Sequence, residues 1–391
     1  MPHRPRLYAA ALLGVAAVGV AALVWVTPRV FAGSAGDARG VNGVSLINNA
    51  TRTPILGLSP VTDGTVVDLT RLTGTRLSLR ADLAAGVDAG SVVFTLTGAK
   101  GDSLRRTESR APFFLCDDYV DCPLLATPDA YTLTAQAYTG TRAGGAAVGV
   151  PFSVRFSVTD RASATRPVDV LFVGNSLLGT VNHVTREDTP TLLHRLAAAE
   201  GRTVRLTKVI HFGYTLRHTW EDGFAAKALS GSGRYDVIVL QEYSTLVATS
   251  LPTATSTLLN LYAPTFARIL KPGGRVVLFK NWALVNPDPF DSRAEAKAAI
   301  DANYAALSAA LTTPNLVAPI GDEFETVIAA HGPSFLIVPD GKHPNDTAVY
   351  LDAVTLYGIL FHESPRGLAD AYLNAPVAAY LRSVAATAIG Y

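Results

Sequence analysis

Three side chains in this sequence could perform nucleophilic catalysis if the fold brings them together. Ser176 follows the apolar run Val168–Val173, and Asp340 and His343 follow a second apolar run, Phe335–Val338. A serine hydroxyl becomes a good nucleophile when a base accepts its proton, and an imidazole is a good base when a carboxylate fixes its tautomer. The spacing of Asp340 and His343 lets one turn of loop aim the carboxylate at the ring. These residues predict a serine hydrolase.

Acyl transfer also builds negative charge on a carbonyl oxygen, so the site needs hydrogen-bond donors. The backbone N–H of Ser176 is one candidate, because Gly174 permits a sharp turn just before it. Gly213, after the apolar run Val204–Ile210, and Gln241, at the end of a later apolar run, are the other candidates. Losing one such donor typically costs about 3–4 kcal/mol of barrier. A plain turn glycine and a structural strand end are equally good interpretations of Gly213 and Gln241.

At these positions the chain resembles the SGNH/GDSL hydrolase superfamily. Its first block is FVGNSL at 172–177, with Asn175 where better-known members carry aspartate, and its last block is DGKHPN at 340–345. The third block, LQEYS at 240–244, lacks the family's Gly-x-Asn-Asp and is similar to divergent subfamilies with an L-Q-E-x-S block. The resemblance covers residues 166–391 and implies a three-layer α/β/α, flavodoxin-like domain. It also implies a triad of Ser176, His343 and Asp340 and an oxyanion hole from Ser176, Gly213 and Gln241.

The elements expected in this half agree with such a domain, because strands and helices alternate along it. Alternation at this spacing predicts a parallel sheet covered by helices on both faces. Reactive loops in such folds gather at the carboxyl ends of the strands. Strands are expected at 168–173, 204–210, 237–240, 276–279 and 316–318, and helices from 189, at 258–270, at 294–311 and at 347–361.

The segment 41–160 has a different pattern, with short alternating stretches of Val, Thr, Leu and Ser separated by Gly, Asn and Asp. Period-two alternation at regular spacing predicts an antiparallel β-sandwich. By its pattern this segment resembles the immunoglobulin-like modules of secreted bacterial glycan-active proteins. It holds the chain's two cysteines, Cys116 and Cys122, which we expect to form a disulfide in an exported protein. The aspartates between them are better explained as a solvated turn than as a calcium site.

The first 35 residues predict export. Basic residues precede an apolar run at 7–26, which is long for a signal-peptide core and just sufficient to cross a bilayer. Small residues at 32–35 offer a cleavage site. Either a cleaved signal peptide or an uncleaved membrane anchor would place the rest of the chain outside the cytoplasm. A polar, proline-ended segment at 161–167 predicts a linker. It would couple the β-rich domain before it loosely to the α/β domain after it.

Composition excludes some partners. The formal net charge is +1 and there is no basic stripe, so nucleic acid is not an expected partner. The histidines show no metal-ligand spacing, and we expect neither a metal nor a cofactor. Aromatic and polar side chains at His211, Tyr214, His218, Trp220, Asn281 and Trp282 suit a cleft that grips a sugar or an acyl chain, although buried packing is the simpler explanation.

The sequence therefore favours an exported serine esterase that acts on acetyl or other short acyl esters of carbohydrate. A lipolytic short-chain esterase is the second candidate. The third, from another class, is a glycan-binding surface protein on a hydrolase fold that has lost activity. The distance between Ser176 and His343 separates the enzymes from the binding protein, because a working pair must lie within hydrogen-bond reach. The natural substrate and the oligomeric state are not predicted.

Overall fold

The computed structural model describes residues 40–72, 75–116, 122–160 and 166–391, all within the compact unit Ala38–Tyr391. The expected signal or anchor at 1–35, the acidic loop at 117–121 and most of the expected linker, 161–165, lie outside the described residues. No described helix combines the length and apolar character that a bilayer crossing needs.

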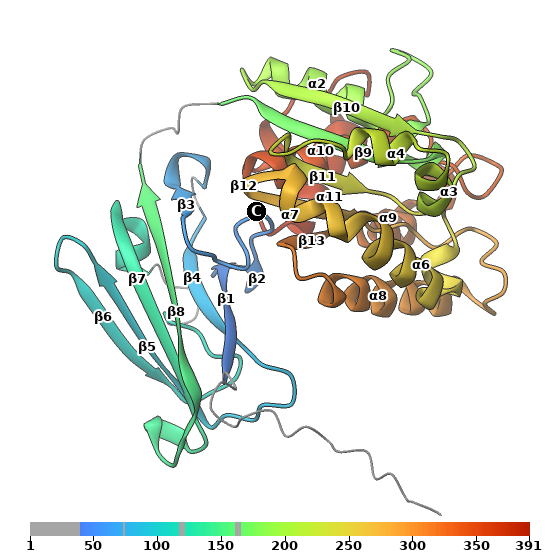
Figure 1. The fold of residues 1–391 in the computed structure, drawn as a ribbon. Helices are drawn as coiled ribbons and strands as arrows, with labels where there is room; N and C mark the ends of the chain where they lie inside the picture. Colours follow the sequence, from blue (N-terminus) through green and yellow to red (C-terminus); the bar gives the residue numbers. More distant parts are fainter. Residues whose placement is uncertain (1–39, 73–74, 117–121, 161–165) are drawn as a thin grey trace, which may run out of the picture. The chain divides into compact units, whose positions relative to one another are not determined.

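The second half is an α/β region built on a five-stranded sheet (Figure 1). All neighbouring strands in it are parallel, so the predicted α/β class with a parallel sheet is confirmed. The strand order, β10-β9-β11-β12-β13, is the order of flavodoxin-like sheets. The strands are β9 (Val168–Gly174), β10 (Val204–Ile210), β11 (Tyr235–Leu240), β12 (Leu270–Phe279) and β13 (Asn315–Ala318).

Both faces of this sheet are buried, which explains the continuous apolar runs in its strands. Val170 and Phe172 of β9 point into one apolar core, and Leu171 and Val173 point into another on the opposite face. Figure 1 shows helices on both sides of the sheet. The first core is closed by α2 (Thr189–Ala199), α9 (Ile320–His331), α10 (Asp346–Phe361) and α11 (Ala375–Ala388). The second is closed mainly by α3 (Leu216–Glu221), α4 (Phe224–Ala228), α6 (Leu251–Thr257), a π-helical turn (Leu258–Tyr262), α7 (Ala263–Ile269) and α8 (Arg293–Ala310).

The helix α10 follows the Asp340–His343 loop directly and is buried on every side from Ala348 to Phe361. It carries Asp352 into the core, where neither carboxyl oxygen has a hydrogen-bond partner among the described residues. Glu323 of α9 is also fully buried and accepts one hydrogen bond, from Thr355 Oγ1 at 2.7 Å. Burial raises the pKa of both carboxyl groups well above their usual range.

Asp352→Asn should change how stability depends on pH. A carboxyl group whose folded-state pKa is raised contributes stability that is fully present below its unfolded pKa and is lost as pH rises through the folded pKa. The free energy of unfolding of Asp352→Asn, measured by urea titration, should therefore rise relative to wild type between pH 4 and pH 8, by at most about 1.4 kcal/mol per pH unit. The exposed Asp88→Asn is the control, and an equal pH profile for all three proteins would contradict the expectation.

The first half forms two β-sheets that share one apolar core. The smaller has the order β2-β1-β4 and the larger β3-β8-β7-β5-β6. One pairing departs from the expected antiparallel arrangement, because β3 pairs with β8 in parallel. An immunoglobulin-like identity for this region stays a prediction. The strands are β1 (Val41–Asn48), β2 (Thr53–Pro54), β3 (Thr65–Asp68), β4 (Leu77–Leu83), β5 (Ser91–Gly98), β6 (Ser103–Glu108), β7 (Asp129–Tyr138) and β8 (Ala147–Thr159).

Cys116 and Cys122 form the predicted disulfide, with 5.5 Å between their Cα atoms.

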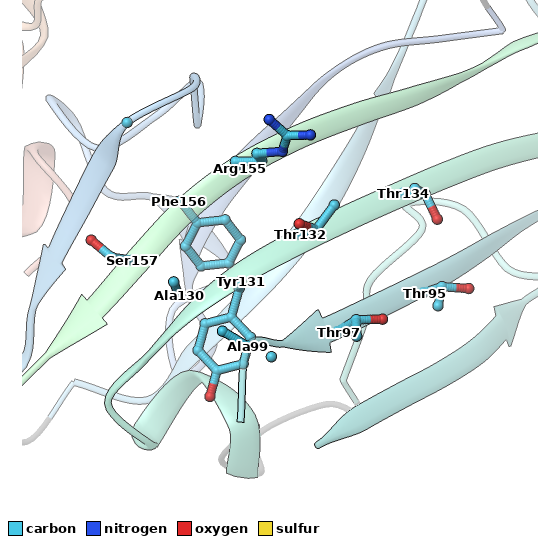
Figure 2. A pocket seen from close by; sticks show the side chains of 12 residues that line it. Thr95, Thr97, Ala99, Ala130, Tyr131, Thr132, Thr134, Arg155, Phe156 and Ser157 are labelled. Carbon is cyan, nitrogen blue, oxygen red and sulfur yellow. The ribbon is translucent and has the colours of Figure 1, made fainter. Parts of the chain in front are cut away.

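On the larger sheet, a hollow of about 540 Å³ lies over β5, β7 and β8. Figure 2 shows its labelled threonines and Arg155 on these strands. This hollow contains none of the residues predicted to be catalytic; its polar side chains are Thr95, Thr97, Thr132, Thr134, Arg155 and Ser157, together with Tyr131.

Candidate active site

The candidate nucleophile lies at the carboxyl end of β9. Ser176 is the first residue of a short helix, α1 (Ser176–Gly179), and only 6% of it is exposed. Asn175 caps this helix, since its side-chain oxygen accepts a hydrogen bond from the Leu177 N–H at 3.2 Å. The amide nitrogen of Asn175 donates to the carbonyl of Tyr214 at 3.0 Å. Asn175 thus fixes the turn before Ser176 and ties it to the loop after β10.

The structure brings Ser176, His343 and Asp340 together, although Ser176 and His343 are 167 positions apart. His343 Nε2 lies 2.9 Å from Ser176 Oγ, and His343 Nδ1 lies 2.6 Å from Asp340 Oδ2. The other carboxylate oxygen of Asp340 accepts the backbone N–H groups of Lys342 and His343, at 2.8 and 2.9 Å. The imidazole is therefore held between a hydroxyl and a carboxylate, as proton transfer from serine requires.

These hydrogen bonds also set the charge of Asp340. Partial burial opposes ionisation of its carboxyl group, but the hydrogen bonds from the His343 side chain and the two backbone N–H groups outweigh this and lower its pKa below the usual range. The ionised carboxylate is the stronger acceptor for a hydrogen bond from the Nδ1–H of His343. It thus persists to lower pH than in an isolated aspartate.

A buried tryptophan holds the loop that carries Asp340 and His343. Trp282 Nε1 donates to the Lys342 carbonyl at 3.1 Å, and its ring stacks on Phe324 with 3.9 Å between ring centres. The N–H of Val285 donates to the Gly341 carbonyl at 2.9 Å in the same loop. Only 1% of Trp282 is exposed, so the packing interpretation holds for it rather than substrate contact at a cleft mouth.

Gly213 lies in the loop after β10 with a backbone φ of +78°, which favours glycine. The loop is tied to the nucleophile, because the N–H of His211 donates to the Gly174 carbonyl at 3.0 Å. Among the described residues, no acceptor is bonded to the N–H of Gly213. The N–H of Ser176 likewise has no acceptor among the described residues.

Gln241 differs from the expectation that it donates to an oxyanion. Its side chain is fully buried, and both N–H groups of its amide are used, one by the Glu242 carbonyl and the other by Asn281 Oδ1 at 3.2 Å. Its Oε1 accepts the N–H of Asn175 at 2.9 Å. Gln241 therefore supports the turn before Ser176, and the geometry leaves it no free donor. Asn281, 1% exposed, is a buried partner in the same network rather than a cleft residue.

The closeness of Gln241 also explains Gly174. A Cβ atom at Gly174 would lie 2.8 Å from Gln241 Oε1 and 2.9 Å from Leu178 Cδ1. Gly174 is not in the left-handed region, so glycine is needed here for close approach rather than for a sharp turn.

Gly174→Ala should therefore displace Gln241 and the turn that carries Ser176. Overpacking of this kind typically costs about 1–3 kcal/mol. We expect a loss of that size in the free energy of unfolding and a larger relative loss in kcat than in KM, measured with a chromogenic ester. Gly43→Ala is the matched control, because nothing lies within 4 Å of its added Cβ. Wild-type stability and kcat in Gly174→Ala would contradict this account.

Two exposed aromatic rings lie in or against the loop after β10. Phe212 is 63% exposed, and its ring contacts Gly179 of α1 closely enough that a Cβ there would be 2.6 Å from Phe212 Cε1. Phe224, 45% exposed, stacks on His211 with 4.0 Å between ring centres. These rings could contact part of a substrate that is bound at Ser176. The sequence analysis does not predict a role for Phe212, because a sequence alone does not indicate that this ring is exposed. Tyr214 contacts His211 and His218, and Trp220 packs on Tyr262.

Within the described residues, no group of three or more His, Cys, Asp or Glu side chains is arranged to hold a metal ion. His183 pairs with Asp346 at 2.9 Å, and His331 stacks on Phe335. These histidines therefore have structural contacts of their own.

Comparison with known proteins gives likenesses of fold only. No family model matches the sequence, and no curated protein sequence matches it. A DUF4886 family protein from Bacteroides uniformis superposes with a TM-score of 0.48 at 18% identity, covering 58% of this chain and 96% of that one. The esterase EstA from Pseudoalteromonas sp. gives a TM-score of 0.38 at 16% identity, with 50% and 97% covered. A lipase/acylhydrolase from Enterococcus faecalis gives 0.36 at 15% identity, with 52% and 97% covered.

Proposed function

We propose that this protein is a serine esterase of the SGNH type, with Ser176 as nucleophile, His343 as general base and acid, and Asp340 as the residue that orients His343. The observation that carries the proposal is the continuous contact from Asp340 Oδ2 through His343 to Ser176 Oγ, at 2.6 and 2.9 Å. Both distances lie within the range for a nucleophile and its base. The site belongs to the proposed catalytic domain, residues 166–391.

The reaction follows from these contacts. Ser176 Oγ attacks the ester carbonyl while its proton passes to His343 Nε2, and Asp340 stabilises the imidazolium. The N–H groups of Ser176 and Gly213 would stabilise the oxyanion of the tetrahedral intermediate. The intermediate collapses to an acyl-enzyme and releases the alcohol, which takes the proton from His343. Water then attacks the acyl group with His343 again as base, which releases the carboxylic acid and restores the Ser176 hydroxyl.

We further propose that the natural substrate is an acetyl or other short acyl ester of a carbohydrate, and that the protein is exported, either secreted or anchored through residues 7–26. The disulfide between Cys116 and Cys122 supports export, since disulfides persist in oxidising compartments. The exposed rings of Phe212 and Phe224 suit either a sugar face or an acyl chain. A short-chain lipid ester is thus the second substrate candidate.

The function is tested by two measurements on the soluble protein. Wild type should hydrolyse p-nitrophenyl acetate above the uncatalysed rate. A p-nitrophenyl alkylphosphonate should inactivate it with stoichiometric release of p-nitrophenolate, and peptide mass spectrometry should place the adduct on Ser176. Absence of turnover on this ester and on acetylated glycans, together with no adduct, would remove the case for an esterase.

Phe212→Ala should show whether the exposed ring of Phe212 contacts the acyl chain or the sugar of the substrate. Loss of a stacking or apolar contact of about 1–2 kcal/mol corresponds to a rise in KM of roughly tenfold. If the ring contacts an acyl chain, the rise should grow from p-nitrophenyl acetate to the butyrate and octanoate. If it contacts a sugar, the rise should appear with acetylated oligosaccharides and be small for all three chromogenic esters. Val150→Ala, an exposed residue of the β region, is the control.

A second candidate function is glycan binding without catalysis. The hollow over β5, β7 and β8 favours it, because its threonine hydroxyls and Arg155 could hydrogen-bond a sugar (Figure 2). Isothermal titration of the Ser176→Ala protein with soluble polysaccharides tests it. Binding that is lost in Thr97→Ala and Thr132→Ala, in a protein with no turnover and no phosphonate adduct, would favour this candidate over the esterase.

A further inference from the structure

The Gln241 amide of the third block leaves no donor for an oxyanion, yet the same block holds a buried carboxyl group, that of Glu242. Glu242 follows Gln241 at the end of β11 and is 5% exposed. Its Oε1 accepts two backbone N–H groups, from Tyr243 at 2.6 Å and from Leu216 at 3.0 Å. One carboxylate oxygen thus bridges the loop after β11 and the loop after β10.

The contact with Leu216 matters because of what that loop carries. Leu216 is the first residue of α3, and Gly213 lies three residues before it. The first N–H groups of a helix have no partner within the helix, so an outside acceptor fixes where the helix begins. The same loop is held at its other side by the hydrogen bond from His211 N–H to the Gly174 carbonyl. Glu242 therefore fixes the far end of a short loop whose centre presents the free N–H of Gly213.

The surroundings of Glu242 are built to hold it in place. Asn281 Nδ2 donates to the Glu242 carbonyl at 2.8 Å, and Asn281 is itself buried. Burial raises the pKa of Glu242, against the opposing effect of the N–H groups of Tyr243 and Leu216. In either protonation state, an oxygen of the side chain can accept the N–H of Leu216.

We propose that Glu242 is a positioning residue that holds the Gly213 N–H where the oxyanion forms. It acts through the Leu216 N–H and does not touch the substrate. The proposal rests on the esterase function above. In place of Gln241 as a third oxyanion donor, it gives the third block the role of holding the second donor, the N–H of Gly213. Donors aimed at an oxyanion work only when they are preorganised, and a displacement of about 1 Å can cost roughly 100-fold in rate.

Leu216→Pro tests the contact from the donor side with little change of backbone. Proline is tolerated at the first position of a helix, and Thr215 already has the extended conformation, φ −82° and ψ 163°, that a residue before proline adopts. This variant removes the N–H and most of the leucine side chain. Leu216→Ala, the matched control, removes a similar part of the side chain and keeps the N–H.

Glu242→Leu and Glu242→Gln test it from the acceptor side, since only glutamine keeps an oxygen for the Leu216 N–H. We expect kcat for p-nitrophenyl acetate to fall about 10–100-fold in Leu216→Pro relative to Leu216→Ala, and in Glu242→Leu relative to Glu242→Gln. KM should stay within about threefold in both pairs, because the oxyanion contact is made in the transition state. Amide hydrogen exchange in a peptide spanning 211–217 should be faster in Leu216→Pro and Glu242→Leu than in their controls.

Other results overturn the proposal. Equal kcat within each pair would show that the contact does not serve catalysis, and unchanged exchange would show that it does not hold the loop. An equal loss in Glu242→Gln and Glu242→Leu relative to wild type, beside a difference in the Leu216 pair, would show that Glu242 acts through its charge and not through the hydrogen bond to Leu216. If Glu242→Leu does not fold, the Leu216 pair decides. If wild type is no faster than Ser176→Ala, the esterase function falls instead, and exchange alone decides whether Glu242 holds the loop.

Discussion

Ser176→Ala and His343→Ala are each expected to lower kcat for p-nitrophenyl acetate by about 10⁴–10⁶, and the double variant should fall little further. The reason is that the two groups perform one step, since His343 Nε2, 2.9 Å from Ser176 Oγ, accepts the proton that makes the oxygen nucleophilic. Once either is absent the other contributes nothing to attack. Steady-state kinetics with active-site concentrations from phosphonate titration of wild type give the measurement.

The controls for this prediction are an exposed serine and an exposed histidine. Ser103→Ala on β6 and His194→Ala on α2 should keep wild-type kcat, because both side chains face solvent outside the site. All variants should unfold within a few degrees of wild type. A Ser176→Ala protein that keeps a tenth of wild-type kcat would show that another group attacks the ester.

Asp340→Asn is expected to lower kcat by about 10³–10⁴ at pH 7 with little change in KM. Asparagine can keep its oxygen on the N–H groups of Lys342 and His343, which now donate to Asp340 Oδ1. Its amide N–H would then face His343 Nδ1 and force that nitrogen to accept. The proton would move to Nε2, the nitrogen that must receive the proton of Ser176, so the base would be blocked.

The lowered pKa of Asp340 limits what this carboxylate contributes to the pH profile of the wild type. Since its hydrogen bonds lower the pKa of Asp340, the stability that it contributes to the loop is present above its unfolded pKa and is lost only as pH falls through the lower folded value. Protonation of Asp340 should thus contribute nothing to a loss of activity between pH 7 and pH 5. If Asp340→Asn and wild type have the same kcat at pH 7, the carboxylate does not orient His343.

Much of the α/β half could be predicted because its signals are local. Period and composition indicate the five strands, and the ends of three of them mark Ser176, Gly213 and Gln241. The Asp340–His343 pair could be recognised because both residues lie within one turn of loop. Their approach to Ser176 became visible only in the structure, because their loop lies between α9 and α10 and follows no strand of the parallel sheet.

The supporting contacts could not be predicted, because they depend on which strands become neighbours. Gln241 reaches Asn175 only because β11 lies beside β9, and nothing near Gln241 in the sequence indicates that partner. Glu242 reaches Leu216 across 26 positions because the loops after β11 and β10 meet over β9, the strand that lies between them. A glycine that permits a turn and a glycine that admits a neighbouring side chain look the same in a sequence. The reason why position 174 requires glycine is therefore visible only in the structure. The sequence pattern also did not predict helices α3, α4, α6, α9 and α11.

Trp282 gives the protein an optical reporter of the loop that carries Asp340 and His343. The chain has three tryptophans, and this one combines a buried ring, stacked on Phe324, with a hydrogen bond to the backbone of Lys342. Indole emission is sensitive to both polarity and hydrogen bonding, so release of the Lys342 carbonyl should shift the spectrum. With Trp25 and Trp220 replaced by phenylalanine, the remaining emission would come from Trp282 alone. Stopped-flow fluorescence could then follow the loop during a single turnover without any added dye.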